Sequence, residues 1–390
     1  MKICIVSMNL GSYFDSTPHR KYGGAEVQAA FVARALKDQG FDVSLVVADL
    51  TADAHVPYPA INAFQTTDGL PVLRFFHPRM SGIFAALAQA GADVYYQRNA
   101  GMVTGLVADY ARRNGKGFIY GAGSDTDFSL RTVLIEGWRD RLIYMYGLRR
   151  AHGVVVQNNA QLNAARRVLK GPVVSIPNGV MPAEQSDTNA GGPILWAGAL
   201  RPVKRPDLFI ELARRFPERE FVMVGGSVST SVPYAEATQE QARAVANLQL
   251  TGWLPNADVV RLISRASVVV NTSTVEGFPN VYLEAWNHGV PVVAFNDVDG
   301  LLEHEGLGAL CSNLDDLEQK LRALLDDPAA LRTAGQRARD LVARRFSPAV
   351  LGPRYATFIR DVLSAQTEGF PATAARTPPL LNTSARESED

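Results

Sequence analysis

Short apolar runs alternate with helical patterns along almost the whole chain, and this alternation restricts the fold more than any other feature. Runs such as "KICIVS", "GVVVQ" and "SVVVNTS" are apolar and rich in β-branched residues. The stretches between them, such as "AEVQAAFVARALKDQG" and "RPDLFIELARRFP", place apolar residues at three- and four-residue intervals. Buried strands that alternate with amphipathic helices form parallel sheets with helices on both faces. The sequence therefore predicts an α/β fold with doubly wound sheets.

The strand-helix pattern starts twice, because the stretch "NGVMPAEQSDTNAGG" interrupts it without any periodicity of its own. A chain of 390 residues is also too long for one ordinary core. Two Rossmann-like domains should then face each other across a cleft, with ligands bound where the carboxyl ends of the strands meet it. The predicted first domain spans residues 1–178, the linker 179–192 and the second domain 193–346. A helix over 347–365 should pack back toward the first domain, and 366–390 should form a tail without ordered structure.

Composition excludes several classes of protein. Lys+Arg and Asp+Glu both number 39, so no overall charge favours a nucleic-acid partner. The two cysteines, Cys4 and Cys311, lie in separate apolar stretches and are expected to be buried reduced thiols. The first apolar run is too short for a signal peptide, and no segment approaches the roughly 18 to 20 apolar residues of a membrane span. We expect a cytoplasmic protein.

The stretch "NTSTVEGFPNVYLEAWNHGVP" carries the candidate chemistry, with Glu276 on the loop after a strand and Glu284 inside the following helix. The free N–H groups of Asn280 and Val281 at the helix start would attract a phosphate. Two carboxylates beside an anion site fit a ligand with both hydroxyls and phosphates. A nucleotide-sugar has both, although a solvated loop glutamate and a surface helix glutamate remain the alternative.

"EGFPNVYLEA" followed by "HGVPVV" resembles the signature of retaining glycosyltransferases of family 4, and the resemblance extends to about residue 365. It implies the GT-B fold, with Glu276 contacting the transferred sugar and Glu284 holding the nucleotide ribose. It places Gly277 and Phe278 in the donor site as well. It also implies transfer of a glycosyl group from a nucleotide-sugar to a hydroxyl acceptor, with the anomeric configuration retained.

Two further stretches support the resemblance. "YGGAEVQ" resembles the glycine-rich loop of the family, in which Gly23 and Gly24 let the backbone approach a phosphate or an acceptor. "WAGALRPVKRPDLF" resembles the basic loop of the donor domain. There Lys204 would meet the donor phosphates with Arg201 or Arg205 nearby, because the leaving nucleoside diphosphate gains negative charge. Which of the three cations contacts which phosphate stays open.

The sequence departs from the family at two positions. Ala199 stands where the family has an arginine, and Ala122 stands where many members have an acceptor-domain histidine. Asp125 and Asp127 follow closely and are candidates for the acceptor side, with loop or helix-cap aspartates as the other interpretation. Arg98 is a further acceptor-side candidate.

No metal or cofactor is expected, because the six histidines show no metal-ligand spacing and no aspartate pair follows a strand of the second domain. The fingerprints of dinucleotide-binding and P-loop enzymes are missing after the first strand. Two alternatives remain: a sugar-nucleotide epimerase of the same fold, and a sugar-binding or interaction protein without activity.

Two stretches of the first domain, 74–84 and 131–150, mix aromatic residues with arginines. They are candidates for peripheral contact with the inner face of a membrane carrying a lipid-linked acceptor. Ordinary acceptor-domain helices with exposed arginines are the other interpretation. The acceptor is therefore left as a glycan, a lipid-linked molecule or a small molecule.

Overall fold

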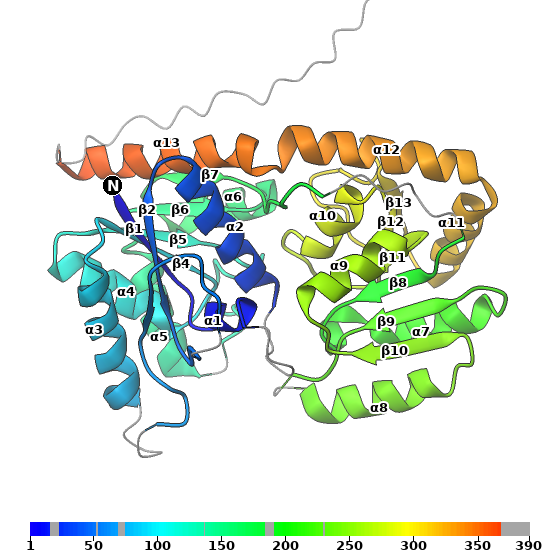
Figure 1. The fold of residues 1–390 in the computed structure, drawn as a ribbon, viewed down its shortest axis with the longest axis horizontal. Helices are drawn as coiled ribbons and strands as arrows, with labels where there is room; N and C mark the ends of the chain where they lie inside the picture. Colours follow the sequence, from blue (N-terminus) through cyan, green and yellow to red (C-terminus); the bar gives the residue numbers. More distant parts are fainter. Residues whose placement is uncertain are drawn as a thin grey trace, which may run out of the picture.

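Two parallel β-sheets lie side by side, each with helices on both faces (Figure 1). The structure, a computed structural model, describes residues 1–15, 23–51, 54–68, 75–135, 137–183, 191–228 and 231–367. Residues 184–190 of the predicted linker and the predicted tail from residue 368 onward lie outside these ranges. The two sheets fall within the residue ranges expected for the two domains.

The first sheet has the strand order β3-β2-β1-β4-β5-β6-β7, and all its neighbouring strands pair in parallel. Its order reverses between β1 and β4, as in doubly wound folds. The elements of the first domain are β1 (Lys2–Val6), α1 (Leu10–Tyr13), α2 (Gly24–Asp38), β2 (Asp42–Val47), β3 (Ala60–Asn62), η1 (Phe75–Met80), α3 (Ser81–Ala90), β4 (Val94–Arg98), α4 (Met102–Arg113), β5 (Gly117–Gly121), α5 (Trp138–Leu148), β6 (Gly153–Val156), α6 (Asn159–Val168) and β7 (Val173–Ser175).

Alternating residues of the strands in the first sheet enter two separate cores. Ile3 and Ile5 of β1 pack with α2 and α13 on one face. Cys4 and Val6 pack with α3, α4 and α5 on the other. The central strands are therefore buried on both faces, which explains why they read as continuous apolar runs. Cys4 is unpaired, as predicted, and burial raises the pKa of its thiol to about 12.

The second sheet repeats this plan with the order β10-β9-β8-β11-β12-β13, again all parallel. Among the described residues, no helix combines the length and the apolar character needed to cross a bilayer. The elements of the second half are β8 (Ile194–Ala197), η2 (Pro202–Lys204), α7 (Pro206–Arg215), β9 (Phe221–Val224), α8 (Val232–Arg243), β10 (Leu248–Gly252), α9 (Asn256–Arg265), β11 (Val268–Asn271), α10 (Asn280–Asn287), β12 (Val292–Ala294), β13 (Gly308–Leu310), α11 (Leu314–Asp326), α12 (Pro328–Arg345) and α13 (Pro348–Thr367).

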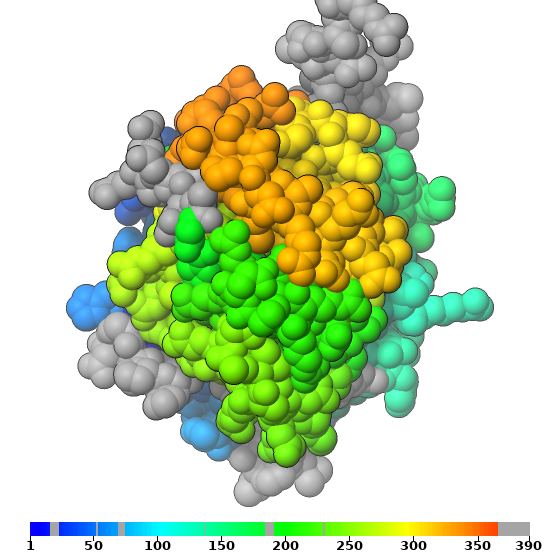
Figure 2. Space-filling model, turned by 90° about the vertical axis from the view of Figure 1, so that its right-hand side faces the viewer, coloured from blue at the N-terminus to red at the C-terminus, as the bar shows by residue number. Residues whose placement is uncertain are grey.

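The last two helices join the domains across one side of the molecule. In Figures 1 and 2 the orange helix α12 lies over the second domain, and Figure 1 shows α13 continuing over the first. Tyr355, Ile359 and Val362 of α13 are buried in the core that α2 lines. The predicted C-terminal helix that packs back toward the first domain is therefore confirmed.

This packing makes α13 part of the first core. We expect Ile359→Ala to lower the free energy of unfolding by about 2 to 5 kcal/mol, because Ile359 is fully buried and its removal leaves a cavity. Thr357→Ala, on the exposed side of the same helix, is the matched control and should change stability by less than about 0.5 kcal/mol. Urea unfolding of both variants measures the difference, and equal effects would show that α13 does not belong to the core.

Candidate functional site

Two loops of the second domain bring Lys204 and Glu276 together. The loops follow β8 and β11, which are neighbours where the strand order reverses, so both leave the same edge of the sheet. Lys204 Nζ lies 2.6 Å from Glu276 Oε1, and the Asn271 side chain donates to the same oxygen at 3.2 Å. The side chain of Glu276 is 9% exposed and that of Lys204 29% exposed. The switch point of a doubly wound sheet, where ligands bind, thus carries an ion pair.

A threonine fixes the loop that presents Lys204. The Thr272 hydroxyl lies 2.8 Å from the carbonyl oxygens of both Lys204 and Arg205. It also accepts a hydrogen bond from the indole N–H of Trp196 at 3.0 Å. Because Trp196 is on β8 and Thr272 directly follows β11, this hydroxyl ties together the two loops that carry the ion pair.

The other two predicted cations are placed differently. Arg205 has a left-handed backbone with a φ of 45°, and its guanidinium forms an ion pair with Asp207 at 2.8 Å. Arg201 is half-buried, and within the described part of the chain its Nε has no hydrogen-bond partner. Lys204 is therefore the one of these three that contacts Glu276.

The starts of α2 and α10 meet across the domain boundary. The side-chain amide of Asn280, the first residue of α10, donates to the carbonyl of Gly24 at 2.7 Å. A Cβ on Gly24 would lie 2.5 Å from that amide nitrogen, so a larger residue here would displace the Asn280 side chain from this contact. Gly23 precedes α2, and its N–H donates to Glu26. Val281 is half-buried at the start of α10. Two helix N-termini, each favouring an anion, therefore converge beside the loop that carries Glu276.

Asn178 links the two domains through both ends of its side chain. Its amide nitrogen donates to the carbonyl of Phe278 at 2.7 Å and to the side-chain oxygen of Asn280 at 2.9 Å. Its amide oxygen accepts from Arg98 at 2.7 Å and from Gln157 at 3.2 Å. Arg98, predicted on the acceptor side, is buried in this contact. The ring of Phe278, a predicted donor-site residue, is buried as well.

Asp125 lies where the first domain contacts the Glu276 loop. The Asn158 side chain donates to Asp125 Oδ1 at 3.0 Å and to the carbonyl of Gly277 at 2.9 Å. Gln161 donates to the same aspartate oxygen at 2.8 Å. A Cβ on Gly277 would lie 2.6 Å from the Gln157 side-chain oxygen, so a larger residue here would require the Gln157 side chain to move. Asp125 is thus placed beside the loop that carries Glu276.

Asp127 holds the loop that carries Asp125. Its carboxylate accepts hydrogen bonds from the Tyr120 hydroxyl and from the Gly123 N–H, both at 2.8 Å. Burial raises the pKa of this carboxyl, and the residue is only 3% exposed. Ala122, at the position of the family's histidine, is fully buried. Asp127 therefore positions a loop, whereas Asp125 is exposed.

Glu284 lines a cavity of about 530 Å³ between the domains. Burial raises the pKa of its carboxyl from 4.5 to about 7. Both ring nitrogens of His288, one turn further along the chain, are buried without a partner among the described residues. Burial, and the nearby charge of Arg339, lower the pKa of this imidazole. The other charged or titratable residues that line the cavity are Tyr13, Arg34 and Tyr58.

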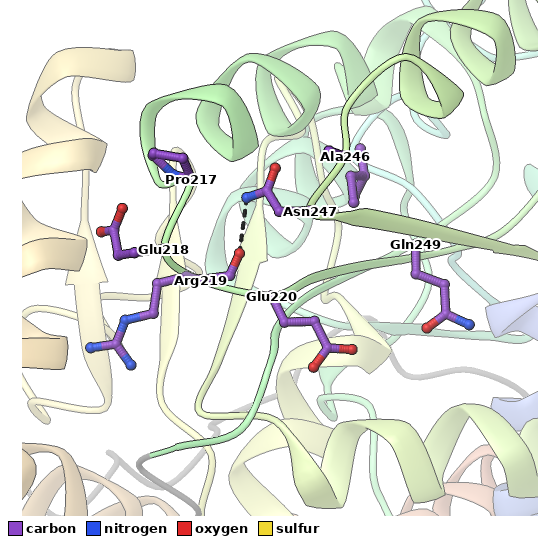
Figure 3. Close-up of a pocket in the computed structure, with 8 residues that line it drawn as sticks. Pro217, Glu218, Arg219, Glu220, Ala246, Asn247 and Gln249 are labelled. Carbon is purple, nitrogen blue, oxygen red and sulfur yellow. Dashed lines mark hydrogen bonds between the residues drawn. The ribbon is translucent and has the colours of Figure 1, made fainter.

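A second hollow, of about 390 Å³, lies at the opposite edge of the second sheet (Figure 3). It surrounds the starts of β9 and β10, and there the Asn247 side chain donates to the carbonyl of Arg219 at 2.9 Å. Its residues are remote in the sheet from the loops that carry Lys204 and Glu276. Within the described ranges, no group of three or more His, Cys, Asp or Glu side chains is placed to hold a metal ion.

Three asparagines of the site were not anticipated: Asn158, Asn178 and Asn271. Signals for two of them were available, since Asn271 ends the run "SVVVN" and Asn178 stands in "SIPNGV". An asparagine at the carboxyl end of a buried parallel strand lies at the ligand edge of the sheet. The partners of Asn158 and Asn178 include residues of the other domain, so the sequence alone could not supply them, whereas the partner of Asn271 is Glu276 on the same loop.

Comparison with known proteins identifies the class of the second domain. Residues 192–327 match the family described as glycosyl transferases group 1. D-inositol 3-phosphate glycosyltransferase from Kribbella flavida is 31% identical over 161 residues, which are 37% of this chain and 38% of that protein. Glycosyltransferase 1 domain-containing protein 1 from Xenopus tropicalis is 27% identical over 169 residues, 42% of this chain and 48% of that protein. The chain thus matches less than half the length of these relatives.

Solved structures extend the likeness over both domains. Sucrose-phosphate synthase from Thermosynechococcus elongatus superposes with a TM-score of 0.73 at 20% identity, over 94% of this chain and 100% of that chain. HepE from Anabaena, solved in complex with UDP and glucose, gives a TM-score of 0.71 at 18% identity, over 93% and 100%. Residues 192–327 therefore match the glycosyl transferases group 1 family, and the chain as a whole has the GT-B fold. Both predictions are confirmed at this level.

The half-buried carboxyl of Glu284 should make stability depend on pH. The folded protein keeps a proton on Glu284 up to about pH 7, whereas the unfolded chain releases it near pH 4.5. The free energy of unfolding should then fall as the pH rises from about 5 to about 8, by up to about 3 kcal/mol from this group. Glu284→Gln should remove that contribution.

Urea unfolding at both pH values measures the effect as the difference between variant and wild type. The control is Glu240→Gln on the exposed side of α8, which should keep the wild-type slope. An identical pH slope in Glu284→Gln would contradict the raised pKa.

Proposed function

We propose that this chain transfers a glycosyl group from a nucleotide-sugar to a hydroxyl acceptor with retention of the anomeric configuration and without a metal ion. The observation that carries the proposal is the Lys204–Glu276 ion pair at the switch point, beside the adjoining starts of α2 and α10. Proteins of similar fold have been solved with UDP-glucose (HepE) and with UDP and alpha-GlcNAc-glycerol (TarM).

The arrangement suits a donor that carries both charge and hydroxyls. The diphosphate would lie at the helix starts and take Lys204 as its counter-ion. Glu276 then contacts sugar hydroxyls with a carboxylate that Asn271 already orients. Within the described residues, Glu276 Oε2 carries no hydrogen bond, because both contacts go to Oε1. Lys204 and Glu276 neutralise each other's charge when no donor is bound. A bound donor would contact Lys204 through its diphosphate and Glu276 through its sugar hydroxyls.

The proposed reaction breaks the bond between the anomeric carbon and the diphosphate oxygen, and the electron pair stays on the diphosphate. The acceptor oxygen bonds to the anomeric carbon on the same face, and its proton passes to the departing diphosphate. Lys204 and the helix starts stabilise the charge on the leaving group. Glu276 orients the sugar where positive charge develops. The retained configuration follows from the family resemblance.

Glu284 would accept hydrogen bonds from the two ribose hydroxyls of the donor. It lies four residues after Asn280 on α10, so one helix offers both the phosphate end and the ribose end of the site. Asp125 is proposed on the acceptor side because it stands beside the Gly277 loop. We place the protein in the cytoplasm, with peripheral membrane contact as part of the proposal.

A ligand screen tests the donor directly. The thermal unfolding midpoint is measured with UDP-, GDP-, ADP- and TDP-sugars, followed by release of the free nucleoside diphosphate. A donor at about 100 times its Kd should stabilise the fold by about 2.7 kcal/mol. Stabilisation without any diphosphate release or sugar transfer would favour a silent sugar-binding protein, and a changed sugar without an acceptor product would favour an epimerase.

Glu276→Gln should lower kcat by roughly 10²-fold or more while donor affinity changes much less, because a charge that acts in the transition state is removed at constant shape. Steady-state transfer assays and donor calorimetry measure the two effects. Glu218→Gln, an exposed glutamate at the far edge of the same domain, is the matched control and should keep wild-type turnover. Near-normal turnover of Glu276→Gln, or a product of inverted configuration, would contradict the mechanism.

A further inference from the structure

One region of the first domain exposes large apolar side chains in unusual density. Of the ten exposed large hydrophobic side chains in the described residues, four fall between positions 130 and 142. Trp138 is 76% exposed and Leu134 74% exposed, and Leu130 and Leu142 are exposed too. Single exposed apolar residues are normal, whereas a group of them marks a binding surface.

A second segment adjoins this group. The guanidinium of Arg139, on α5, lies 4.0 Å from the centre of the Phe75 ring on η1. The Phe75 ring packs edge-on against Phe76, which is exposed. The apolar group therefore includes residues from η1 and from the start of α5. These two segments are far apart in the chain, and the contact between Arg139 and Phe75 brings them together. Residues 74 and 136, which belong to the two stretches predicted for membrane contact, lie outside the described residues.

The outward face of α5 continues the group as a stripe along the helix. Trp138 and Leu142 are exposed one turn apart, and Tyr146 follows half-buried after one more turn. The inward face of the same helix is apolar as well, since Tyr144 and Leu148 are buried in the first domain. A helix that is apolar on both faces needs a partner on its outer one. The helix α13 does not cover it, because α13 packs on the opposite face of the sheet (Figure 1).

Arginines surround this stripe. Residues 129–150 contain five arginines against two acidic residues, a net charge of +3 in a chain whose net charge is zero. Arg131, Arg149 and Arg150 are exposed, and the guanidinium of Arg150 lies over the Tyr146 ring at 3.8 Å. Apolar and aromatic side chains surrounded by arginines match a partner whose outer layer is negatively charged and whose layer beneath is apolar.

We propose that this surface, made by Phe76, Leu130, Leu134, Trp138 and Leu142 with the arginines of 131–150, docks the protein on an anionic phospholipid bilayer. The apolar side chains enter the interface between headgroups and acyl chains, and the arginines contact the lipid phosphates. The surface lies outside the candidate site, so the proposal holds whether or not the proposed transfer occurs. The proposal assigns the membrane contact expected from the sequence to a defined face of the first domain.

Vesicle co-sedimentation of the full chain without any substrate tests the proposal. The probes are vesicles of phosphatidylcholine alone and of phosphatidylcholine with about a third phosphatidylglycerol. We expect binding to the anionic vesicles, weakened by high salt, and little binding to the neutral ones. Leu134→Ser with Trp138→Ser should weaken binding by roughly tenfold or more, since two exposed apolar anchors are lost. Arg131→Gln with Arg149→Gln should weaken it by about fivefold per arginine.

Matched variants on the second domain are the controls. Val232→Ser removes an exposed apolar side chain, and Arg214→Gln with Arg261→Gln removes two exposed arginines, so both should bind vesicles like the wild type. Circular dichroism verifies that every variant is folded. Three results would overturn the proposal: no binding to anionic vesicles, equal binding by the surface variants and the controls, or a dimer in light scattering that the surface variants abolish while vesicles are not bound.

Discussion

The candidate site depends on one constraint, the common direction of two neighbouring parallel strands. Because β8 and β11 are adjacent and point the same way, the loops that follow them must leave the sheet at the same edge. Lys204 and Glu276 are 72 positions apart and still meet at 2.6 Å. The Thr272 hydroxyl fixes the distance between the loops, so the ion pair is a consequence of the sheet rather than of the two charges alone.

The contact between the domains is polar and buried. It is stable only because its buried donors and acceptors form hydrogen bonds with one another. Asn178 uses both donors and its acceptor, and its partners come from both domains. An alanine there would leave several buried groups without partners, each at a cost of about 1 to 3 kcal/mol. Gly24 and Gly277 leave room beside the contact for the side chains of Asn280 and Gln157. Together with the helices α12 and α13, this polar contact sets the relative position of the domains and with it the shape of the cleft.

The parts of this molecule that could be predicted from the sequence are those buried on both sides. Strands in the centre of each sheet read as continuous apolar runs, and so they could be found. Three strands at the edges of the sheets, β3, β10 and β13, carry no continuous run of β-branched residues. An edge strand is covered on fewer sides, so its short sequence, such as "LQLTG" in β10, carries no apolar run. The candidate residues Glu276 and Lys204 could be placed on loops, but their contact and the burial of Arg98 and Phe278 depend on distant residues.

The loop after β5, which carries the candidate acceptor-side residue Asp125, shows how one substitution limits the chemistry that is available. Ala122 is buried at the position aligned with the histidine that many members of the resembled family have, so no imidazole acts from this position. The loop that follows is held by the buried carboxylate of Asp127, and it carries Asp125 toward the Gly277 loop. Asn158 and Gln161 both donate to Oδ1 of Asp125, which holds the carboxylate in place and leaves Oδ2 to accept a hydrogen bond from a hydroxyl. In the proposed reaction such a carboxylate orients the acceptor, and the departing diphosphate remains the group that takes its proton.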